Sequence, residues 1–185
     1  MGWLAEYRQD VQKYRALNGG GAWKQVLTEL GLWALLEYRV EAALYRSTLT
    51  PVLKKPLLWA TIPWRLLVQM ATGISLPCTA VIGAPVHIPH SGGIVVHGNA
   101  RVGAHCCICQ GVTIGISGRG ERRGVPRIGD RVFLGVNAVV VGKIVVGDDA
   151  VIGANSLVNR DVPPHSTAVG VPAVVVSDRG SEELL

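Results

Sequence analysis

Residues 126–158 read PRIGDRVFLGVNAVVVGKIVVGDDAVIGANSLV and carry an aliphatic residue at every sixth position. A glycine follows most of these aliphatic residues, and the register holds without a slip to the end of the stretch. The same spacing extends upstream, with a shift of two residues after Ile94 and a longer interruption after Ile114. The repeating positions are Leu76, Ile82, Ile88, Ile94, Val102, Ile108, Ile114, Ile128, Leu134, Val140, Val146, Ile152 and Val158.

A strict period of six fits neither regular element, because a helix repeats its apolar face about every 3.6 residues and a strand every two. It indicates a solenoid whose flat sides are short strands and whose corners are turns. Three hexads complete one turn, and each aliphatic side chain stacks on its equivalent one turn later. Glycine, Asp and Asn at the corners are expected to supply the positive φ angles that tight turns need.

The segments that carry a family resemblance are IPHSGGIVV (88–96), QGVTIG (110–115), PRIGDRVFLGVNAVV (126–140) and VPPHSTAVGVPA (162–173). They resemble the hexapeptide-repeat acyltransferases, in the branch of the serine acetyltransferases, and most of all its short members that O-acetylate bacterial exopolysaccharides or capsules. The resemblance covers residues 70–176. It implies a mainly β fold, a left-handed parallel β-helix with an N-terminal α-helical subdomain. It also implies an acetyl-CoA-dependent enzyme that forms a homotrimer with each active site between two subunits.

The chain of 185 residues is predicted to divide into an N-terminal helical region (1–72), the solenoid with a loop at 115–127 (73–176) and a flexible tail (177–185). Helices are predicted over 3–17, 22–47 and 51–71. The third is expected to break or bend near Pro56 and Pro63, because proline lacks the N–H that a helix interior uses.

Composition narrows the class of protein further. Hydrophobic residues make up 49% of the chain, which excludes a disordered protein, and the formal net charge is +5. This charge permits a phosphorylated ligand, an anionic membrane or nucleic acid as partner. The four cysteines are not spaced as a disulfide framework, and the first residues lack the pattern of a signal peptide. A cytoplasmic location is therefore expected.

Residues 51–71 leave two interpretations open. The segment is apolar, but prolines and cations interrupt it before it reaches the roughly 20 residues of a membrane-spanning helix. It either packs on the solenoid or another subunit, or lies in the surface of the inner membrane as an interfacial helix. The interfacial interpretation places Lys54, Lys55 and Arg65 at the lipid headgroups, with Trp59 and Trp64 as anchors.

His90 is the first candidate catalytic residue. A free hydroxyl is a poor nucleophile at neutral pH, and an imidazole can accept its proton as it attacks a thioester. From the residues alone, a solvated turn histidine is the simpler interpretation. The resemblance assigns the general base to His90, with Ser91 and Gly92 beside the substrate.

The sequence departs from the serine acetyltransferases at two places that matter for the acceptor. Pro89 stands where the family has an Asp that orients the histidine, and Gly124-Val125 stand where it has an Arg-His pair, of which the Arg binds the serine carboxylate. These departures argue against L-serine as acceptor, unless Arg122 or Arg123 takes the place of the missing arginine. If His90 needs an orienting acid, the helices offer three candidates, namely Asp10, Glu37 and Glu41.

The loop 115–127 is rich in glycine and arginine, which suits a phosphate ligand such as CoA. Nucleic acid is a weaker alternative, because the loop has no aromatic residue, and a solvated mobile loop is the plainest one. By resemblance, the pantetheine arm of CoA runs between adjacent coils. The predicted CoA-binding residues are Ser117, Gly118, Arg119, Arg127, Val136, Ala138 and Ala154, and Arg122 and Arg123 are predicted to contact the acceptor.

The segment HCCICQG (105–111) suggests a metal site at first sight. Neighbouring residues of a strand point to opposite faces, so Cys106 and Cys107 cannot both face one ion. We therefore expect no metal, with Cys106 as a small inward hydrophobe.

The function that the sequence favours is transfer of an acetyl group from acetyl-CoA to a sugar hydroxyl in exopolysaccharide or capsule biosynthesis. The alternatives are a divergent serine O-acetyltransferase and a non-catalytic solenoid scaffold. The expected partners are a small-molecule or glycan acceptor and further copies of the chain, with peripheral membrane contact through residues 51–71 and no nucleic acid.

Overall fold

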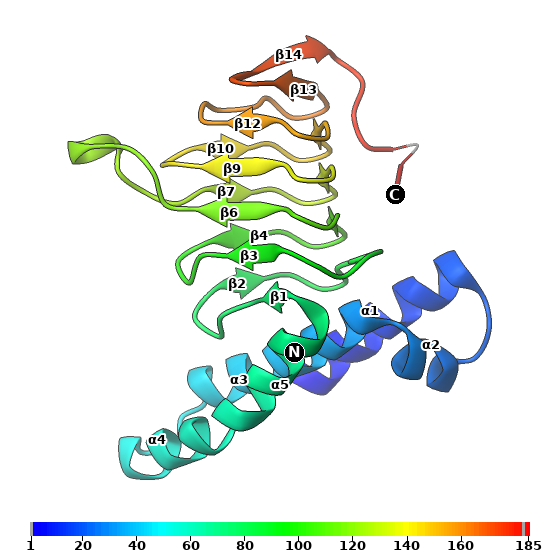
Figure 1. The fold of residues 1–185 in the computed structure, drawn as a ribbon, viewed down its shortest axis with the longest axis vertical. Helices are drawn as coiled ribbons and strands as arrows, with labels where there is room; N and C mark the ends of the chain where they lie inside the picture. Colours follow the sequence, from blue (N-terminus) through cyan, green and yellow to red (C-terminus); the bar gives the residue numbers. More distant parts are fainter. Residues whose placement is uncertain (1, 183) are drawn as a thin grey trace.

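The computed structural model describes residues 2–182 and 184–185, without the side chain of Arg122. Five helices precede the first strand (Figure 1), namely α1 (Trp3–Asn18), α2 (Ala22–Thr28), α3 (Leu30–Arg46), α4 (Pro51–Ala60) and α5 (Ile62–Thr72). The predicted helix over 22–47 divides at Glu29, whose backbone is extended (φ −96°, ψ 103°). The predicted helix over 51–71 divides at Thr61. Pro63 then lies in the first turn of α5, where its missing N–H leaves no bond unmade, and Pro56 is held within α4.

The rest of the chain winds into a solenoid of three sheets (Figure 1). Its strands are β1 (Ile74–Ser75), β2 (Val81–Ile82), β3 (Ile94–Val96), β4 (Arg101–Val102), β5 (Cys107–Ile108), β6 (Thr113–Gly115), β7 (Arg127–Ile128), β8 (Phe133–Leu134), β9 (Val139–Val141), β10 (Val145–Val146), β11 (Val151–Ile152), β12 (Leu157–Val158), β13 (Thr167–Gly170) and β14 (Ala173–Ser177). Sheet A holds β1, β3, β6, β9 and β12, sheet B holds β2, β4, β7 and β10, and sheet C holds β5, β8, β11, β13 and β14.

The chain visits the sheets in the order A, B, C, and the strands pair in parallel except β13 with β14. Because the coil rises as it runs from right to left across the face toward the reader, the solenoid is left-handed (Figure 1). Three edges join the sheets, which we call the A/B, B/C and C/A edges. In Figure 1 the A/B edge with its projecting loop is on the left and the C/A edge is on the right.

The interior confirms the hexad register. Leu134, Val140 and Ile152 are fully buried, and their equivalents above and below are nearly so. Parallel pairing stacks each leading residue on the one a full turn away, as Ile152 lies beside Leu134 in β11 and β8. A dry aliphatic column therefore runs along the solenoid axis.

The corners differ in detail from the expectation for glycine. Glycines such as Gly111 (74°) do have positive φ, but so do six described residues that are not glycine, among them Asn137 (57°) and Asn155 (55°). The glycine that follows most of the aliphatic residues is needed for space instead. A Cβ on Gly135 would lie 2.7 Å from the carbonyl oxygen of Ile152, because successive coils touch there. Glycine is thus selected by the close approach of the backbones, and Asn supplies the left-handed turn.

A buried ion pair attaches the helical region to the first coils of the solenoid. Arg39 of α3, with 1% of its surface exposed, donates from Nε to Asp10 of α1 over 3.0 Å. The same guanidinium donates to the carbonyl oxygens of Ile82 and Gly83, each over 2.6 Å. Asp10 in turn accepts the N–H of Val86. Helices α1 and α3 therefore pack on the solenoid, and the two interpretations of residues 51–71 are not decided by this contact.

Two buried acids, Glu37 and Glu41, lie next to each other on α3, and they make the stability of the protein depend on pH. Burial and the neighbouring Glu41 raise the pKa of Glu37 to about 8, and Oε1 of Glu37 has no hydrogen-bond partner among the described residues. Glu41 is held by Arg65 at 3.2 Å.

We expect Glu37→Gln to stabilise the protein at pH 8.5 and to change little at pH 4.5. Because the folded-state pKa of Glu37 is raised, its contribution to stability is complete below about pH 4.5 and is lost as the pH rises through 8. The amide mimics the protonated acid, so the gain at high pH should be about 1–3 kcal/mol. Urea unfolding at both pH values measures it, and an equal effect at both would contradict the assignment.

Helices α4 and α5 expose much apolar surface. Val52, Trp59 and Met70 are 81%, 73% and 85% exposed. Two of the cations expected at lipid headgroups face the protein instead, since Lys54 bonds the carbonyl of Ser47 and Arg65 bonds Glu41. In the described part of the chain, none of the helices combines the length and the hydropathy needed to cross a bilayer.

Candidate active site

The C/A edge is a ladder of four stacked corners that begins at His90. The N–H of Gly111 donates to the carbonyl of Gly92 over 2.8 Å, and the next corner continues through Asn137 N–H and the carbonyl of Gln110. The N–H of Asn155 then donates to the carbonyl of Val136 over 2.8 Å. Each corner is therefore fixed on the one below it. His90 stands at the helical end of a rigid edge that also carries Val136 and Ala154.

His90 lines a cavity of about 420 Å³ that lies between the C/A edge, helix α1 and the C-terminal segment. The walls are mostly apolar, with Leu17 of α1, Phe133 and Val136 of the solenoid, and the two leucines that end the tail. Its lining comprises Lys13, Leu17, His87, Pro89, His90, Cys107, Cys109, Gln110, Phe133, Val136, Leu184 and Leu185. The side chain of His90 is exposed, so an acceptor hydroxyl can reach its ring from solvent.

The three carboxylates considered for orienting His90 are engaged elsewhere. Asp10 binds Arg39 and the N–H of Val86, and Glu41 binds Thr61 and Arg65. Glu37 interacts with Glu41 inside the helical region. The expectation that one of them reaches His90 is therefore wrong, because the helical region uses its acids for its own attachment and packing.

The neighbouring His87 lies deeper in the same cavity and is held neutral. Its ring meets that of Tyr14 edge-on, with 4.7 Å between centroids. Burial, and then the charges of Lys13 and His90, lower the pKa of His87 to about 4. It gives the cavity an uncharged imidazole next to the candidate base.

The C-terminal segment packs against the solenoid, where a loose tail was expected. Ser181 is fully buried, and its N–H donates to the carbonyl of Asp149 over 2.9 Å. Lys13 of α1 donates to the main-chain oxygen of Leu185 over 2.8 Å. The segment runs down the side of the solenoid toward α1 (Figure 1). It thereby brings Leu184 and Leu185 into the His90 cavity.

Asp149, His165 and Glu182 are the one group of possible metal ligands whose atoms converge among the described residues, within 4.8 Å of one another. Their charges are already matched. Arg131 donates to both oxygens of Asp149, over 2.6 and 2.7 Å, and holds the pKa of that carboxyl below its usual value. His165 lies 2.8 Å from Glu182. We interpret the group as an ion-pair cluster that fastens the tail.

Residues 115–127, which we call the arginine loop, lie at the A/B edge, whereas His90 lies at the C/A edge of the same sheet A. The loop forms a short hairpin in which Ser117 and Gly124 exchange both backbone hydrogen bonds, with a 3₁₀ turn at Gly120–Arg122. Ser117, Gly118 and Arg119 line one cavity of the A/B edge. Arg123 and Arg127 line another, and the Arg122 side chain lies outside the description.

The predicted site residues thus separate into two groups within one chain. His90, Ser91, Gly92, Val136 and Ala154 share the C/A edge. Ser117, Gly118, Arg119, Arg123 and Arg127 lie on or beside the A/B edge. Ala138 belongs to neither, because its side chain is completely buried in the solenoid and only its backbone could approach a ligand.

Sequence reasoning missed several residues of the two sites. Gln110 could have been found, since it occupies the same corner position as Val136 in the repeat. Lys13, Leu17 and the tail leucines had no local signal, because only the tertiary packing brings them to His90.

The cysteines behave as small core residues. Cys106 is fully buried and turns its Sγ toward the carbonyl of Gly129, 3.2 Å away, whereas Cys107 lies 3.8 Å from Nδ1 of His87. The two thiols point to different partners, as strand alternation predicts. Burial raises the pKa of Cys106 to about 12, which makes it a poor thiolate nucleophile.

Known proteins that resemble this chain include serine acetyltransferases, and the similarity extends over most of its length. Residues 126–160 match the family described as "Bacterial transferase hexapeptide (six repeats)". The chain is 36% identical over 155 residues to a serine acetyltransferase of Helicobacter pylori, covering 84% of this chain and 86% of that protein. It is 44% identical over 108 residues to that of Mycobacterium tuberculosis, covering 58% of this chain and only 47% of the relative.

Solved structures agree with the sequence relatives. A serine acetyltransferase from Brucella abortus in complex with coenzyme A superposes with a TM-score of 0.81 at 26% identity, covering 96% of this chain and 69% of that one.

Proposed function

Because the chain belongs to the serine acetyltransferase family, we propose that it transfers an acetyl group from acetyl-CoA to a hydroxyl group, with His90 as the general base. The observation that carries this proposal is the position of His90. It stands exposed at the mouth of an apolar cavity, on the edge that also bears Val136 and Ala154. A scaffold would need neither this histidine nor the cavity beside it.

The chemistry needs one base and a protected thioester. A ring nitrogen of His90 takes the proton of the acceptor hydroxyl as its oxygen forms a bond to the acetyl carbonyl carbon. The tetrahedral intermediate then expels the CoA sulfur by breaking the C–S bond, and the imidazolium returns the proton to that sulfur. The apolar walls contributed by Leu17, Phe133 and Leu185 exclude water, which would otherwise hydrolyse the thioester.

The pantetheine arm fits the C/A edge best. Backbone hydrogen bonds stack the corners of this edge, and the small side chain of Ala154 is exposed there. The solved relative with bound coenzyme A supports the co-substrate, and we place the arm against Val136 and Ala154.

We expect Ala154→Trp to weaken CoA binding at least about tenfold, which corresponds to about 1.4 kcal/mol. The indole would cover the surface on which we place the arm, and because Ala154 is exposed the core should not be disturbed. Stabilisation by CoA in a thermal-shift titration measures the effect. Lys24→Trp, on the exposed surface of α2, is the control. An Ala154→Trp variant that CoA stabilises as much as the wild type would contradict the placement.

The relatives favour L-serine as acceptor, and this changes the order of the two candidates. Every relative reported above is a serine acetyltransferase, whereas the sequence departures had favoured a sugar in exopolysaccharide or capsule biosynthesis. One observation still supports the sugar. Gly124 and Val125 occupy the loop where an Arg-His pair would bind serine, and Arg123 is exposed beside them. We therefore propose serine first and a sugar hydroxyl second.

Release of free CoA from acetyl-CoA distinguishes the two acceptors. The wild type is assayed with L-serine and, separately, with nucleotide-linked and lipid-linked sugars. Turnover with serine means that Arg123 or another loop cation has replaced the missing arginine. Turnover with a sugar alone would restore the second candidate, and no turnover with any hydroxyl would refute the transferase proposal.

A homotrimer would unite the two groups of site residues. Within one chain, His90 lies at the C/A edge of sheet A and the arginine loop lies at the opposite A/B edge. If sheet B of one subunit packs beside sheet C of the next, the loop of the first approaches the C/A edge of the second. We propose this arrangement, and sedimentation analysis tests the trimer.

The exposed apolar surface of α4 and α5 supports peripheral contact with the inner face of the membrane. Trp59, Val52 and Met70 face solvent, and Lys55 lies on the same short segment. This contact would suit a lipid-linked acceptor in a cytoplasmic reaction. Flotation with anionic liposomes tests it, and protein that stays wholly in the soluble fraction would refute it.

A further inference from the structure

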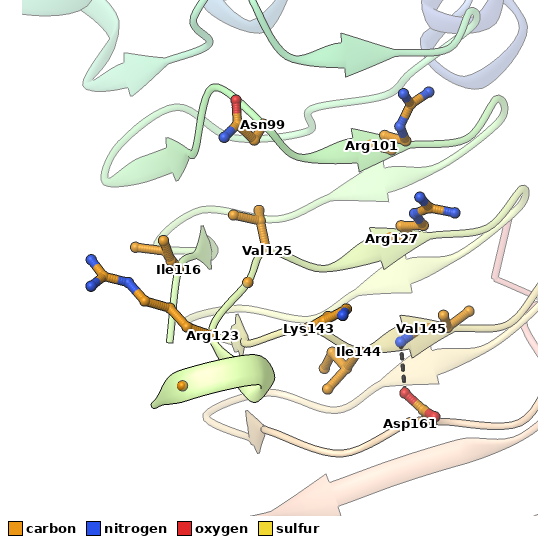
Figure 2. A pocket seen from close by; sticks show the side chains of 12 residues that line it. Asn99, Arg101, Ile116, Arg123, Val125, Arg127, Lys143, Ile144, Val145 and Asp161 are labelled. Atoms are coloured by element: carbon orange, nitrogen blue, oxygen red, sulfur yellow. Dashed lines mark hydrogen bonds between the residues drawn. The ribbon is translucent and has the colours of Figure 1, made fainter. Parts of the chain in front are cut away.

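A cavity of about 870 Å³ opens at the A/B edge and extends over sheet B (Figure 2). Its floor is formed by strands β4, β7 and β10 and its wall by the base of the arginine loop. We call it the A/B cavity. The polar and charged side chains that line it are Asn99, Arg101, Arg123, Arg127, Lys143 and Asp161.

The strand register of sheet B places two cations of this cavity side by side. Arg101 in β4 and Arg127 in β7 are direct partners in the parallel register, one above the other on adjacent strands (Figure 2). Like charges in directly opposed positions destabilise a sheet. Lys143 joins them from the next coil, and Arg123 lies at the mouth with its guanidinium turned outward (Figure 2).

No carboxylate of the described chain balances these charges. Asp161 is the single acid of the lining, and its Oδ1 already accepts the N–H of Val145 over 2.8 Å (Figure 2). Neither Arg101 nor Arg127 nor Lys143 forms an ion pair with a described residue.

Three arginines that attach one part of the fold to another have an acidic partner, whereas exposed arginines such as Arg8 and Arg160 form no ion pair with a described residue. Arg39 is paired with Asp10, Arg65 with Glu41, and Arg131 with Asp149. The chain therefore supplies an acid where an arginine serves packing. At the A/B cavity, Arg101 and Arg127 form an unfavourable pair that has no acidic partner in the described chain. This arrangement points to an anion from outside the chain.

We propose that the A/B cavity is a binding site for a phosphate or diphosphate group. Two guanidinium forks on adjacent strands match the oxygens of such a group, and the Lys143 ammonium adds a point charge. The lining has no aromatic residue on which a base could stack, which disfavours single-stranded nucleic acid. Arg101 and Lys143 are new members of the site, because the sequence singled out only the loop arginines.

Two sources can supply this chemistry. One is CoA, which carries a diphosphate and a 3′-phosphate. The other is an acceptor sugar linked through a diphosphate to a nucleotide or a lipid. Only this choice of source rests on the proposed function, because the anion site itself follows from the charges of the cavity.

The test uses inorganic diphosphate as the probe and isothermal titration calorimetry as the measurement. We expect the wild type to bind it, and the double variant Arg101→Gln/Arg127→Gln to bind at least about tenfold more weakly, because charge-assisted hydrogen bonds are lost. Both side chains are exposed, so the fold should be kept, and thermal unfolding checks this. Arg8→Gln on the exposed face of α1 removes a cation far from the cavity and is the control.

Three results would overturn the site. They are a wild type that does not bind diphosphate at millimolar concentration, a double variant that binds as tightly as the wild type, and an Arg8→Gln variant that is weakened equally. The last would show a general effect of net charge.

Parallel titrations with CoA and with 3′-dephospho-CoA identify the source. If the double variant loses affinity for CoA as well as for diphosphate, CoA is the source. If it loses affinity for CoA but not for 3′-dephospho-CoA, the bound group is the 3′-phosphate. If CoA binding is unchanged while diphosphate binding falls, the acceptor is the source. Diphosphate binding by a protein that transfers no acetyl group would leave the site standing while the proposed function fails.

Discussion

Replacement of His90 by alanine is expected to lower kcat for acetyl transfer by about 10²–10⁴-fold, the range typical of a lost general base. The effect should fall on kcat because the imidazole takes a proton only as the hydroxyl attacks. Binding of CoA should persist, since Val136 and Ala154 remain in place on the C/A edge. The thermal unfolding temperature should not change, because His90 is exposed and no described residue depends on it for a hydrogen bond.

The matched control is His105→Ala. His105 is exposed at the B/C edge, between β4 and β5, and lines neither the His90 cavity nor the A/B cavity. Release of CoA with the productive acceptor measures both variants. A His90→Ala enzyme that keeps more than about a tenth of the wild-type turnover would mean that another group is the base. His87 would then be the next candidate, being a neutral imidazole in the same cavity.

Replacement of Asp10 by alanine is expected to lower the free energy of unfolding by about 3–5 kcal/mol. The substitution leaves the Arg39 guanidinium buried without its counter-charge and removes the acceptor of the Val86 N–H. A typical domain has only about 5–15 kcal/mol of stability, so the loss is a large share. Urea unfolding followed by circular dichroism measures it.

A double-mutant cycle separates the pair from its surroundings. Arg39→Met keeps most of the side-chain volume, and in the double variant with Asp10→Ala neither buried charge is left alone. We therefore expect the double variant to be more stable than the sum of the single losses predicts, by about 1–3 kcal/mol. Additive losses would mean that Arg39 acts mainly through the carbonyls of Ile82 and Gly83.

The interior of the solenoid could be predicted from the sequence because its repeat is local. Each hexad places one aliphatic residue inward, so the period of six predicts Leu134, Val140 and Ile152 as core residues, and all three are buried. His90 and the corner residues Val136 and Ala154 were predicted from the family resemblance. The family comparison confirms the fold, whereas the role of His90 stays a prediction.

The hexad pattern predicted less about positions where one coil contacts another or where distant residues form a site. The corner glycines were interpreted through φ, but Gly135 is required by the backbone of the next coil, which a single hexad does not contain. Likewise, the arginines of residues 115–127 and the corner residues were assigned to one CoA site. The structure puts them on different edges, and Arg127 beside Arg101 from an earlier coil.

The sequence by itself determined the solenoid and its inward residues, because these depend on spacing along one segment. The candidate base was assigned by the family resemblance of the same segment. The tertiary structure alone decided that Lys13, Leu17 and Leu185 enclose His90, that Arg39 holds the helices to the first coils, and that Arg101 and Arg127 form an unbalanced pair. Such contacts join residues tens of positions apart, and their energies depend on burial and on which charges meet. A periodic pattern records neither quantity.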